Sequence, residues 1–196
     1  MGAIGILAGL EQADRSASLF INSLNSPLSD LVWQFFSDKL VWIPLYLTVL
    51  VFFFLKLGWK SALKCLVACV LTILICDQFS NLIKDACARL RPCHDPWMLS
   101  HGLHMLEGKG NLYGFFSAHA ANAMGFALCS AFCFKKGSGR KMTAYTILIV
   151  IWALLVGISR IFVGKHFLGD VLVGFAVGAL VGWAVASLAF VIRTSR

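Results

Sequence analysis

The sequence predicts an all-α fold: an integral membrane bundle of about five transmembrane helices, preceded by amphipathic helices at the membrane surface. Of the 196 residues, 59% are hydrophobic and 13% are charged, an apolar fraction too high for a soluble domain of this length. Apolar runs of roughly 18 residues or more, the length that spans a bilayer, recur along the chain. No linker or internal repeat divides it, so residues 1–196 are predicted to form a single membrane-embedded domain.

The first 39 residues are predicted to form an amphipathic interfacial segment, ahead of a helical bundle over residues 40–196. Apolar residues recur there at helical spacing among polar ones: Leu19, Phe20, Leu24, Leu28, Leu31 and Phe35. This pattern predicts short amphipathic helices that lie on the membrane surface. Pro27, directly after Ser26, predicts a break between two of them.

Five membrane spans are predicted in the rest of the chain from the length of its apolar runs. They are Leu40–Leu57, Ala62–Ile83, Tyr113–Phe134, Met142–Ile158 and Phe167–Ile192.

Basic residues concentrate on one side of the predicted membrane, without an acidic residue among them. They are Lys56, Lys60, Lys64, Lys135, Lys136, Arg140, Lys141, Arg193 and Arg196. The positive-inside rule makes this side cytoplasmic. The N-terminus, the loop after the second span and the Ser159–Asp170 turn are therefore predicted to face outward. On that oxidising face the sequence leaves a disulfide between Cys87 and Cys93 open.

Polar residues that do not suit a lipid environment gather at the predicted outer ends of the helices. They come from three separate stretches: Lys84 and Arg91; Ser117 and His119; and Arg160, His166 and Asp170. Helix packing can bring stretches that share one membrane face close together. The sequence therefore predicts one composite polar site.

The residue types in this site suit phosphoryl transfer. Arginine offers forked donors that match phosphate oxygens, and Ser117 can cap a helix whose N-terminus favours phosphate. His166 and Asp170 are four residues apart, hence on one helix face. The carboxylate can hold the proton on one ring nitrogen and leave the other nucleophilic. His119 can then protonate the leaving oxygen.

Nearby polar residues have simpler interpretations. Arg89 and Lys109 are interpreted as anchors at the membrane interface, and Asp77 is expected to face the bundle interior. Three outer-loop histidines are expected to be solvated, with substrate contacts or a metal site as the alternatives: His94, His101 and His104.

Three motifs in these stretches resemble those of a known family. Residues 84–92 fit K-x6-R-P, residues 116–119 resemble the P-S-G-H element, and residues 159–170 fit S-R-x5-H-x3-D. Taken in this order, they are similar to the type 2 phosphatidic acid phosphatase (PAP2) family, which shares its site with vanadium haloperoxidases and bacterial acid phosphatases.

The resemblance implies hydrolysis of a phosphate ester without a metal or another cofactor. It makes His166 the nucleophile, which forms a phosphohistidine, and Asp170 the residue that orients it. His119 becomes the proton donor to the leaving group and then the activator of water. The resemblance also implies a phosphate-binding set: Lys84, Arg91, Ser117, the Ala118 amide and Arg160.

The chain departs from the family pattern in the middle motif and at its N-terminal end. Phe116 stands in place of proline, and Ala118 in place of a glycine that lets the backbone approach phosphate. The Ala118 amide remains available as a donor if its φ is negative. Integral members commonly have six spans, and the first is missing here. We expect the amphipathic N-terminal segment to take its place at the outer interface.

These features together predict a lipid phosphatase of the bacterial cytoplasmic (inner) membrane, with its site at the extracytoplasmic surface. The lipid tail is expected between helices and the head group in the cationic pocket. Undecaprenyl diphosphate is the first candidate substrate, followed by lipid A, with phosphatidylglycerophosphate and phosphatidic acid also open. Head-group selection is expected from the loop between Pro92 and Tyr113, through Trp97 and the three histidines.

The expected partners are lipids alone. The net charge of +8 does not indicate a nucleic-acid partner, because the basic residues lie between and at the ends of apolar runs. No obligate protein partner is inferred. A phosphotransferase with the same site is one alternative. A lipid or phosphate transporter is another, which the near absence of ionisable residues from the span centres and the lack of paired repeats disfavour.

Overall fold

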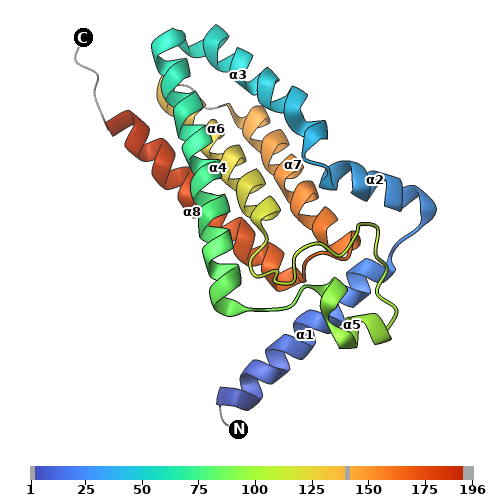
Figure 1. Ribbon diagram of the computed structural model, residues 1–196. Coiled ribbons are helices and arrows are strands. Elements are labelled where there is room, and N and C mark those ends of the chain that lie inside the picture. Colours follow the sequence, from blue (N-terminus) through green and yellow to red (C-terminus); the bar gives the residue numbers. More distant parts are fainter. Residues whose placement is uncertain (1–2, 140–141, 192–196) are drawn as a thin grey trace.

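The structure, a computed structural model, describes residues 3–139 and 142–191. Its elements are α1 (Ala3–Ser23), α2 (Pro27–Ser37), η1 (Leu40–Trp42), α3 (Ile43–Leu57), α4 (Trp59–Cys87), η2 (Pro92–His94), α5 (Pro96–Ser100), α6 (Ala118–Ser138), α7 (Thr143–Phe162) and α8 (Leu168–Val191). The long helices α3, α4, α6, α7 and α8 form the bundle, while α1 and α5 lie at one end of it (Figure 1). The described residues contain no strand, and the predicted all-α class is confirmed.

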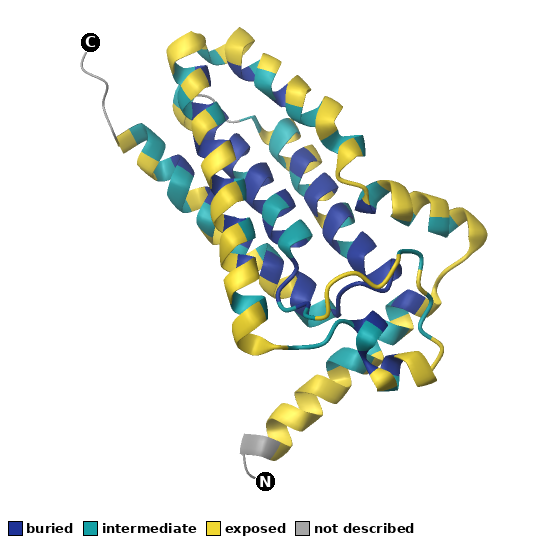
Figure 2. Ribbon diagram, viewed as in Figure 1, coloured by how far each residue is buried: buried dark blue, intermediate teal, exposed yellow. Residues whose placement is uncertain are grey.

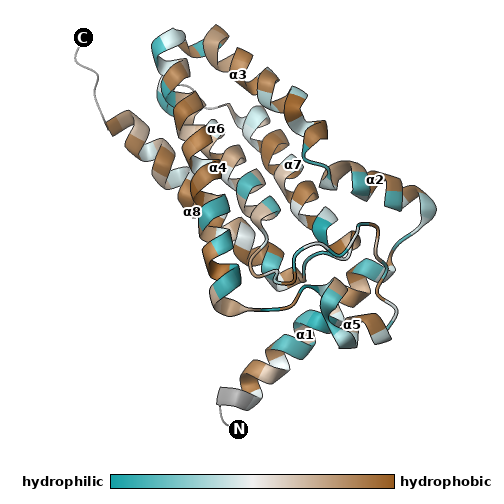
Figure 3. Cartoon of the chain, viewed as in Figure 1, coloured by the Kyte–Doolittle hydropathy of each residue, from teal (hydrophilic) through white to brown (hydrophobic). Residues whose placement is uncertain are grey.

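Within residues 3–139 and 142–191, four segments are long and apolar enough to cross a membrane: Leu40–Leu57, Trp59–Cys87, Thr143–Phe162 and Leu168–Val191. Hydrophobic residues predominate along these helices (Figure 3). The first has the predicted bounds, whereas the second continues past the predicted end at Ile83 to Cys87. The predicted end of the fifth span at Ile192 lies outside the described residues, as do four of the predicted cytoplasmic basic residues, Arg140, Lys141, Arg193 and Arg196.

The helix α6 is the central helix of the bundle, and it is not among the four segments that are apolar enough to cross a membrane. It packs against α4, α7 and α8, and most of its length is buried (Figure 2). Its buried face consists largely of alanine, glycine, serine and cysteine, small residues that let helices approach closely. The predicted start of this span at Tyr113 is wrong, because the helix begins at Ala118, after the capping residue Ser117.

Three glycines on α8 allow it to pack directly on the backbone of α6. They recur every four residues: Gly174, Gly178 and Gly182. A Cβ atom at Gly174 would lie 2.7 Å from the carbonyl oxygen of Ser117, and Cβ atoms at the other two would also clash with α6 carbonyls. This contact aligns the N-terminal ends of the two helices. There the Ser117 amide donates a hydrogen bond of 3.0 Å to the backbone oxygen of Asp170.

The N-terminal segment folds into two helices with the predicted break between them. Ser26 caps α2 through a reciprocal pair of hydrogen bonds with Ser29, and Pro27 occupies the first turn. The first helix has 21 residues and is longer than expected. Several apolar residues are exposed on the two helices: Ile6, Leu7, Leu10, Phe20, Leu28, Leu31, Val32 and Phe35. Their location at a membrane interface stays a prediction.

Candidate active site

The predicted site residues gather at one end of the bundle, where four helix ends meet. Lys84 lies in the last turn of α4, and His119 lies in the first turn of α6. Arg160 lies in the last turn of α7, and Asp170 lies in the first turn of α8. The 88–117 segment covers this end of the bundle (Figure 1). Chain segments far apart in the sequence thus meet here, as predicted.

His166 and Asp170 form a buried pair. The His166 Nδ1 atom lies 3.4 Å from Asp170 Oδ2, and the two side chains are 3% and 0% exposed. The same carboxylate oxygen accepts a hydrogen bond of 3.0 Å from the Phe167 amide. Burial lowers the pKa of His166 to about 4, against the opposing hydrogen bond and charge of Asp170. The imidazole is therefore neutral near pH 7, with its Nε2 atom free of the carboxylate.

Gly114 brings the covering segment close to this pair. A Cβ atom at this position would lie 2.9 Å from Arg91 Cγ and 3.5 Å from both His166 Nδ1 and Asp170 Oδ2. The Arg91 Nε atom donates a hydrogen bond of 3.0 Å to the Tyr113 carbonyl beside it. Arg91 therefore lies next to the His166–Asp170 pair. Gly114 is a site residue that the motifs did not indicate.

Arg160 is buried, and a carboxylate of the outer loop engages it. Its Nη1 and Nη2 atoms donate to Glu107 Oε1 and Oε2, at 3.0 and 3.3 Å. Nη1 also donates to the hydroxyl of Ser37, at the end of α2. The buried Nε atom has no hydrogen-bond partner in the part of the chain that the structure describes. Although burial raises the pKa of Glu107, Arg160 and the Ser37 hydroxyl together hold it below its usual value.

Lys165 holds the same stretch of loop. Its buried Nζ atom donates to the carbonyl oxygens of Gly108 and, at 3.1 Å, Lys109. Gln34 of α2 donates a hydrogen bond of 3.2 Å to the carbonyl of Leu106, on the other side of Glu107. The loop around Glu107 is therefore attached both to α2 and to the turn between α7 and α8.

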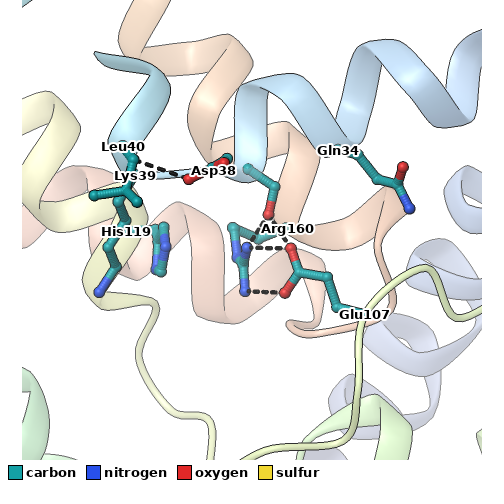
Figure 4. Close-up of a pocket in the computed structure, with 8 residues that line it drawn as sticks. Gln34, Asp38, Lys39, Leu40, Glu107, His119 and Arg160 are labelled. Carbon is teal, nitrogen blue, oxygen red and sulfur yellow. Dashed lines mark hydrogen bonds and ion pairs between the residues drawn. The ribbon is translucent and has the colours of Figure 1, made fainter. Parts of the chain in front are cut away.

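His119 lies where two cavities meet. One of about 530 Å³ is lined by Gln34, Ser37, Asp38, Lys39, Leu40, Glu107, His119 and Arg160. Figure 4 shows the His119 ring and the Arg160 guanidinium facing the same space, with Glu107 reaching Arg160 from the far side. The other cavity, of about 360 Å³, also touches His119 and continues between helices along apolar side chains that include Trp42, Tyr46 and Trp152. Asp77 lines it too, inside the bundle as predicted.

The middle motif places its amides at the start of α6. Ser117 caps the helix, and its Oγ atom accepts a hydrogen bond of 3.4 Å from the Ala120 amide. Ala118 has a negative φ despite replacing glycine, so its amide is among those at the helix start that lack an intrahelical acceptor. The peptide before Phe116 is cis. Lys84 is half-buried, and its Nζ atom has no hydrogen-bond partner among the described residues.

The comparisons with known proteins agree with these motifs. The family model of the PAP2 superfamily matches residues 61–193. The chain belongs to the PAP2 superfamily. It is 32% identical to a lipid A 4'-phosphatase of Bacteroides thetaiotaomicron, over 89% of this chain and 76% of that protein. It is 35% identical to a lipid A 4'-phosphatase of Porphyromonas gingivalis, over 87% of this chain and 70% of that protein.

A solved structure supports the fold of this PAP2 protein. It is a transmembrane PAP2-type phosphatidylglycerolphosphate phosphatase from Bacillus subtilis, with a TM-score of 0.74 at 24% identity. The match covers 96% of this chain and 90% of that one. Together with the apolar helices, these relationships make the protein a multi-pass membrane protein and a phosphoric ester hydrolase of the PAP2 type.

The interpretation of Arg89 as an interface anchor is wrong. Its Nη1 atom lies 2.7 Å from Asp170 Oδ1, and its Nη2 atom lies 2.6 Å from Asp14 Oδ2 on α1. Sequence reasoning missed this contact because the partners are 81 and 75 residues away and no local pattern connects them. The other proposed anchor, Lys109, is exposed.

The loop histidines differ from one another. His104 is not simply solvated, because its Nε2 atom lies 2.9 Å from Asp30 Oδ2 and ties the loop to α2. His101 is exposed and stacks on Trp97, with ring centroids 4.1 Å apart, and His94 Nε2 lies 3.3 Å from the carbonyl of Gly110. The disulfide that the sequence left open does not form in this structure, since Cys87 and Cys93 are free thiols.

Proposed function

We propose that this PAP2 protein is a metal-independent lipid phosphatase that works through a phosphohistidine at His166. The observation that carries the proposal is the buried, neutral imidazole of His166, whose Nδ1 atom is engaged by Asp170. Its Nε2 atom remains to attack phosphorus, beside Arg91 and at the end of membrane-spanning helices.

The reaction proceeds in two balanced steps. In the first, His166 Nε2 forms a bond to phosphorus as the phosphorus–oxygen bond to the leaving group breaks, and His119 gives that oxygen a proton. In the second, water attacks the phosphohistidine, the phosphorus–nitrogen bond breaks, and His119 takes a proton from the water. Asp170 balances the positive charge that the doubly substituted imidazole carries between the two steps.

The phosphate oxygens are held by cations and amides from separate elements. We assign this role to Lys84, Arg91, Ser117, the Ala118 amide and Arg160. Because Glu107 engages both Nη atoms of Arg160, a phosphate must displace this carboxylate to gain the forked pair of donors. The buried Nε atom, which has no partner among the described residues, remains as a further donor.

The substrate is a lipid whose phosphate lies at the extracytoplasmic surface. The described basic residues assigned to the cytoplasm lie at the end of the bundle away from the site: Lys56, Lys60, Lys64, Lys135 and Lys136. This distribution supports an outward-facing site in the bacterial inner membrane. The apolar cavity beside His119 leads between helices and suits part of a lipid.

A lipid A phosphate is the first candidate among lipids. Two relatives of the chain, at 32% and 35% identity, are lipid A 4'-phosphatases. We therefore rank lipid A ahead of undecaprenyl diphosphate, which is the first candidate from the sequence alone. The N-terminal residues 1–39 are proposed to lie at the interface as part of the same domain, because Ser37 and Asp14 reach the site from there.

The test is phosphate release from a panel of lipids by the purified full-length protein, with His166→Ala in parallel. We expect the highest kcat/KM on lipid A, lower values on undecaprenyl diphosphate, phosphatidylglycerophosphate and phosphatidic acid, and no turnover by the folded variant. Activity should persist in chelator. No release from any of the four lipids would contradict the phosphatase, and turnover by His166→Ala would contradict the nucleophile.

A further inference from the structure

We infer that Arg89 is the positioning residue of the nucleophile, and that it acts together with Asp14 of the N-terminal helix to hold Asp170. The helix α1 precedes the segment that the family model matches. On this view it is nevertheless part of the machinery that orients His166. The inference rests on the proposed role of His166.

The first observation is that Arg89 completes the contacts of a fully buried carboxylate. One oxygen of Asp170 accepts from Arg89, at 2.7 Å, and the other faces His166 and the Phe167 amide. The guanidinium also lies over the Phe167 ring, 4.3 Å from its centroid. With both oxygens engaged and no exposed surface, Asp170 has one orientation, and that orientation sets the angle of the imidazole.

The second observation is that α1 caps the first turn of α8. Asp14 Oδ2 binds Arg89, while its Oδ1 atom accepts a hydrogen bond of 2.8 Å from the Gly169 amide. One turn later on α1, Ser18 Oγ accepts a hydrogen bond of 2.8 Å from the Leu168 amide. These are amides at the start of a helix, which lack partners within it. The turn that carries Asp170 is therefore held by side chains about 150 residues away.

The charges of this cluster also suit the proposed reaction. Two carboxylates, Asp14 and Asp170, share the single guanidinium of Arg89, which leaves a net charge of minus one beside His166. The retained negative charge stabilises the cationic phosphohistidine.

Arg15 provides a matched control on the same helix. Its Nη2 atom lies 2.9 Å from Asp95 Oδ2 and 3.1 Å from Glu11 Oε1. It attaches α1 to the outer loop through the buried carboxylate of Asp95, whereas Arg89 binds α1 through Asp14. Arg15 does not touch Asp170 or His166. The kcat of an Arg15 variant therefore shows how much activity is lost when α1 is held less firmly but the contacts of Asp170 are intact.

The experiment compares the full-length protein with Arg89→Gln, Asp14→Asn and Arg15→Gln, by steady-state phosphate release from lipid A. We expect kcat to fall about 10–100-fold in Arg89→Gln and Asp14→Asn, as for other residues that orient an imidazole, with KM changed less than about threefold. Arg15→Gln should retain a kcat within about threefold of the wild type. Arg89→Lys, which keeps the charge without the fork, should recover part of the loss.

The pH profile separates positioning from simple destabilisation. The charged and titratable groups around His166 are Asp170, Arg160, Arg91 and His119. Arg89 binds Asp170 from behind, and Asp14 binds Arg89 in turn. Removal of the Arg89 cation should move the acidic half-maximum of kcat/KM upward by about 0.5–1 pH unit, and removal of the Asp14 anion should move it downward. A merely structural role would move neither.

Wild-type kcat in folded Arg89→Gln, or an equal loss in Arg15→Gln, would overturn the inference. The inference would also be overturned if the acidic half-maximum of kcat/KM moved in the same direction in Arg89→Gln and Asp14→Asn. If Arg89→Gln fails to fold, Asp14→Asn and Arg89→Lys decide the question. The wild type and His166→Ala are measured in parallel. If the wild type is active and His166→Ala is inactive, a contrary result for the Arg89 and Asp14 variants counts against this inference and not against the proposed function.

Discussion

The two histidines of the site differ in their surroundings. The protein's own groups contact the ring of His166, whereas the ring of His119 faces open cavities. Asp170 is fully buried, with its two oxygens held by Arg89, His166 and a backbone amide. His119 lines two cavities, and its ring has no hydrogen-bond partner among the described residues.

On the proposed mechanism, this difference means that the protein itself orients His166 as the nucleophile, whereas the substrate completes the phosphate-binding half. Arg160 shows the contrast most clearly, because its forked donors are held by Glu107, a carboxylate on a loop. A phosphate can replace a loop carboxylate without disturbing the helices. Replacement of the contacts around Asp170 would require α1 and α8 to separate.

The largest expected effect that sharpens this comparison is that of His119→Ala. We expect kcat/KM on lipid A to fall by about 10²–10⁴-fold, because the leaving oxygen loses its proton donor. Loss of kcat/KM on p-nitrophenyl phosphate should be much smaller, since that leaving group departs without a proton. The two substrates are compared by kcat/KM, which reports formation of the phosphohistidine and not its later hydrolysis. His166→Ala is the control and should lose both activities, and equal losses for His119→Ala would contradict its role as an acid.

Gly114→Ala tests the close contact on the nucleophile side. The added Cβ would meet Arg91 Cγ at 2.9 Å and approach the His166–Asp170 pair. We expect kcat/KM to fall by about 10–100-fold through displacement of these groups. Gly108→Ala is the matched control in the same loop, because nothing lies within 4 Å of its added Cβ. Similar kinetics for the two variants would show that Gly114 does not constrain the site.

The smallest expected effect comes from Glu107→Gln, on the phosphate side. Removal of the competing negative charge from Arg160 should tighten competitive inhibition by vanadate by about 3–10-fold. Glu11→Gln, which removes an exposed carboxylate from α1, should leave the inhibition constant unchanged. Weaker vanadate binding in Glu107→Gln would mean that Glu107 orients Arg160 for phosphate and does not compete with it.

The pH dependence of this effect has a definite sign. Arg160 holds the pKa of Glu107 below its usual value of 4.5, against the effect of burial. Above pH 4.5 the wild-type carboxyl is ionised, so its difference from glutamine is fully present. As the pH falls through the lowered pKa, Glu107 becomes protonated and neutral. The vanadate constants of the wild type and the variant should then converge.

The sequence predicted those parts of the molecule that local patterns determine. The i,i+4 spacing placed His166 and Asp170 on one helical face, and the Ser26–Pro27 pair marked the break between α1 and α2. Ser117 was recognised as a helix cap from its place before a long apolar run.

The incorrect predictions came from positions where tertiary contacts override hydropathy. Phe116 is apolar, so the third span was extended back to Tyr113, yet Phe116 is a loop residue buried against the bundle. The two contacts that distinguish the halves of the site, Arg89 with Asp14 and Arg160 with Glu107, join residues 75 and 53 positions apart. Hydrophobic periodicity carries no information about such pairs.

The most direct test of the account is identification of the phosphorylated residue during turnover. Lipid A with a labelled phosphate is mixed with the full-length protein, quenched with alkali within milliseconds, digested and analysed by mass spectrometry under conditions that preserve phosphohistidine. The account predicts an acid-labile phosphate on His166 of the wild-type protein. Label on another residue, or none on His166 during active turnover, would contradict it.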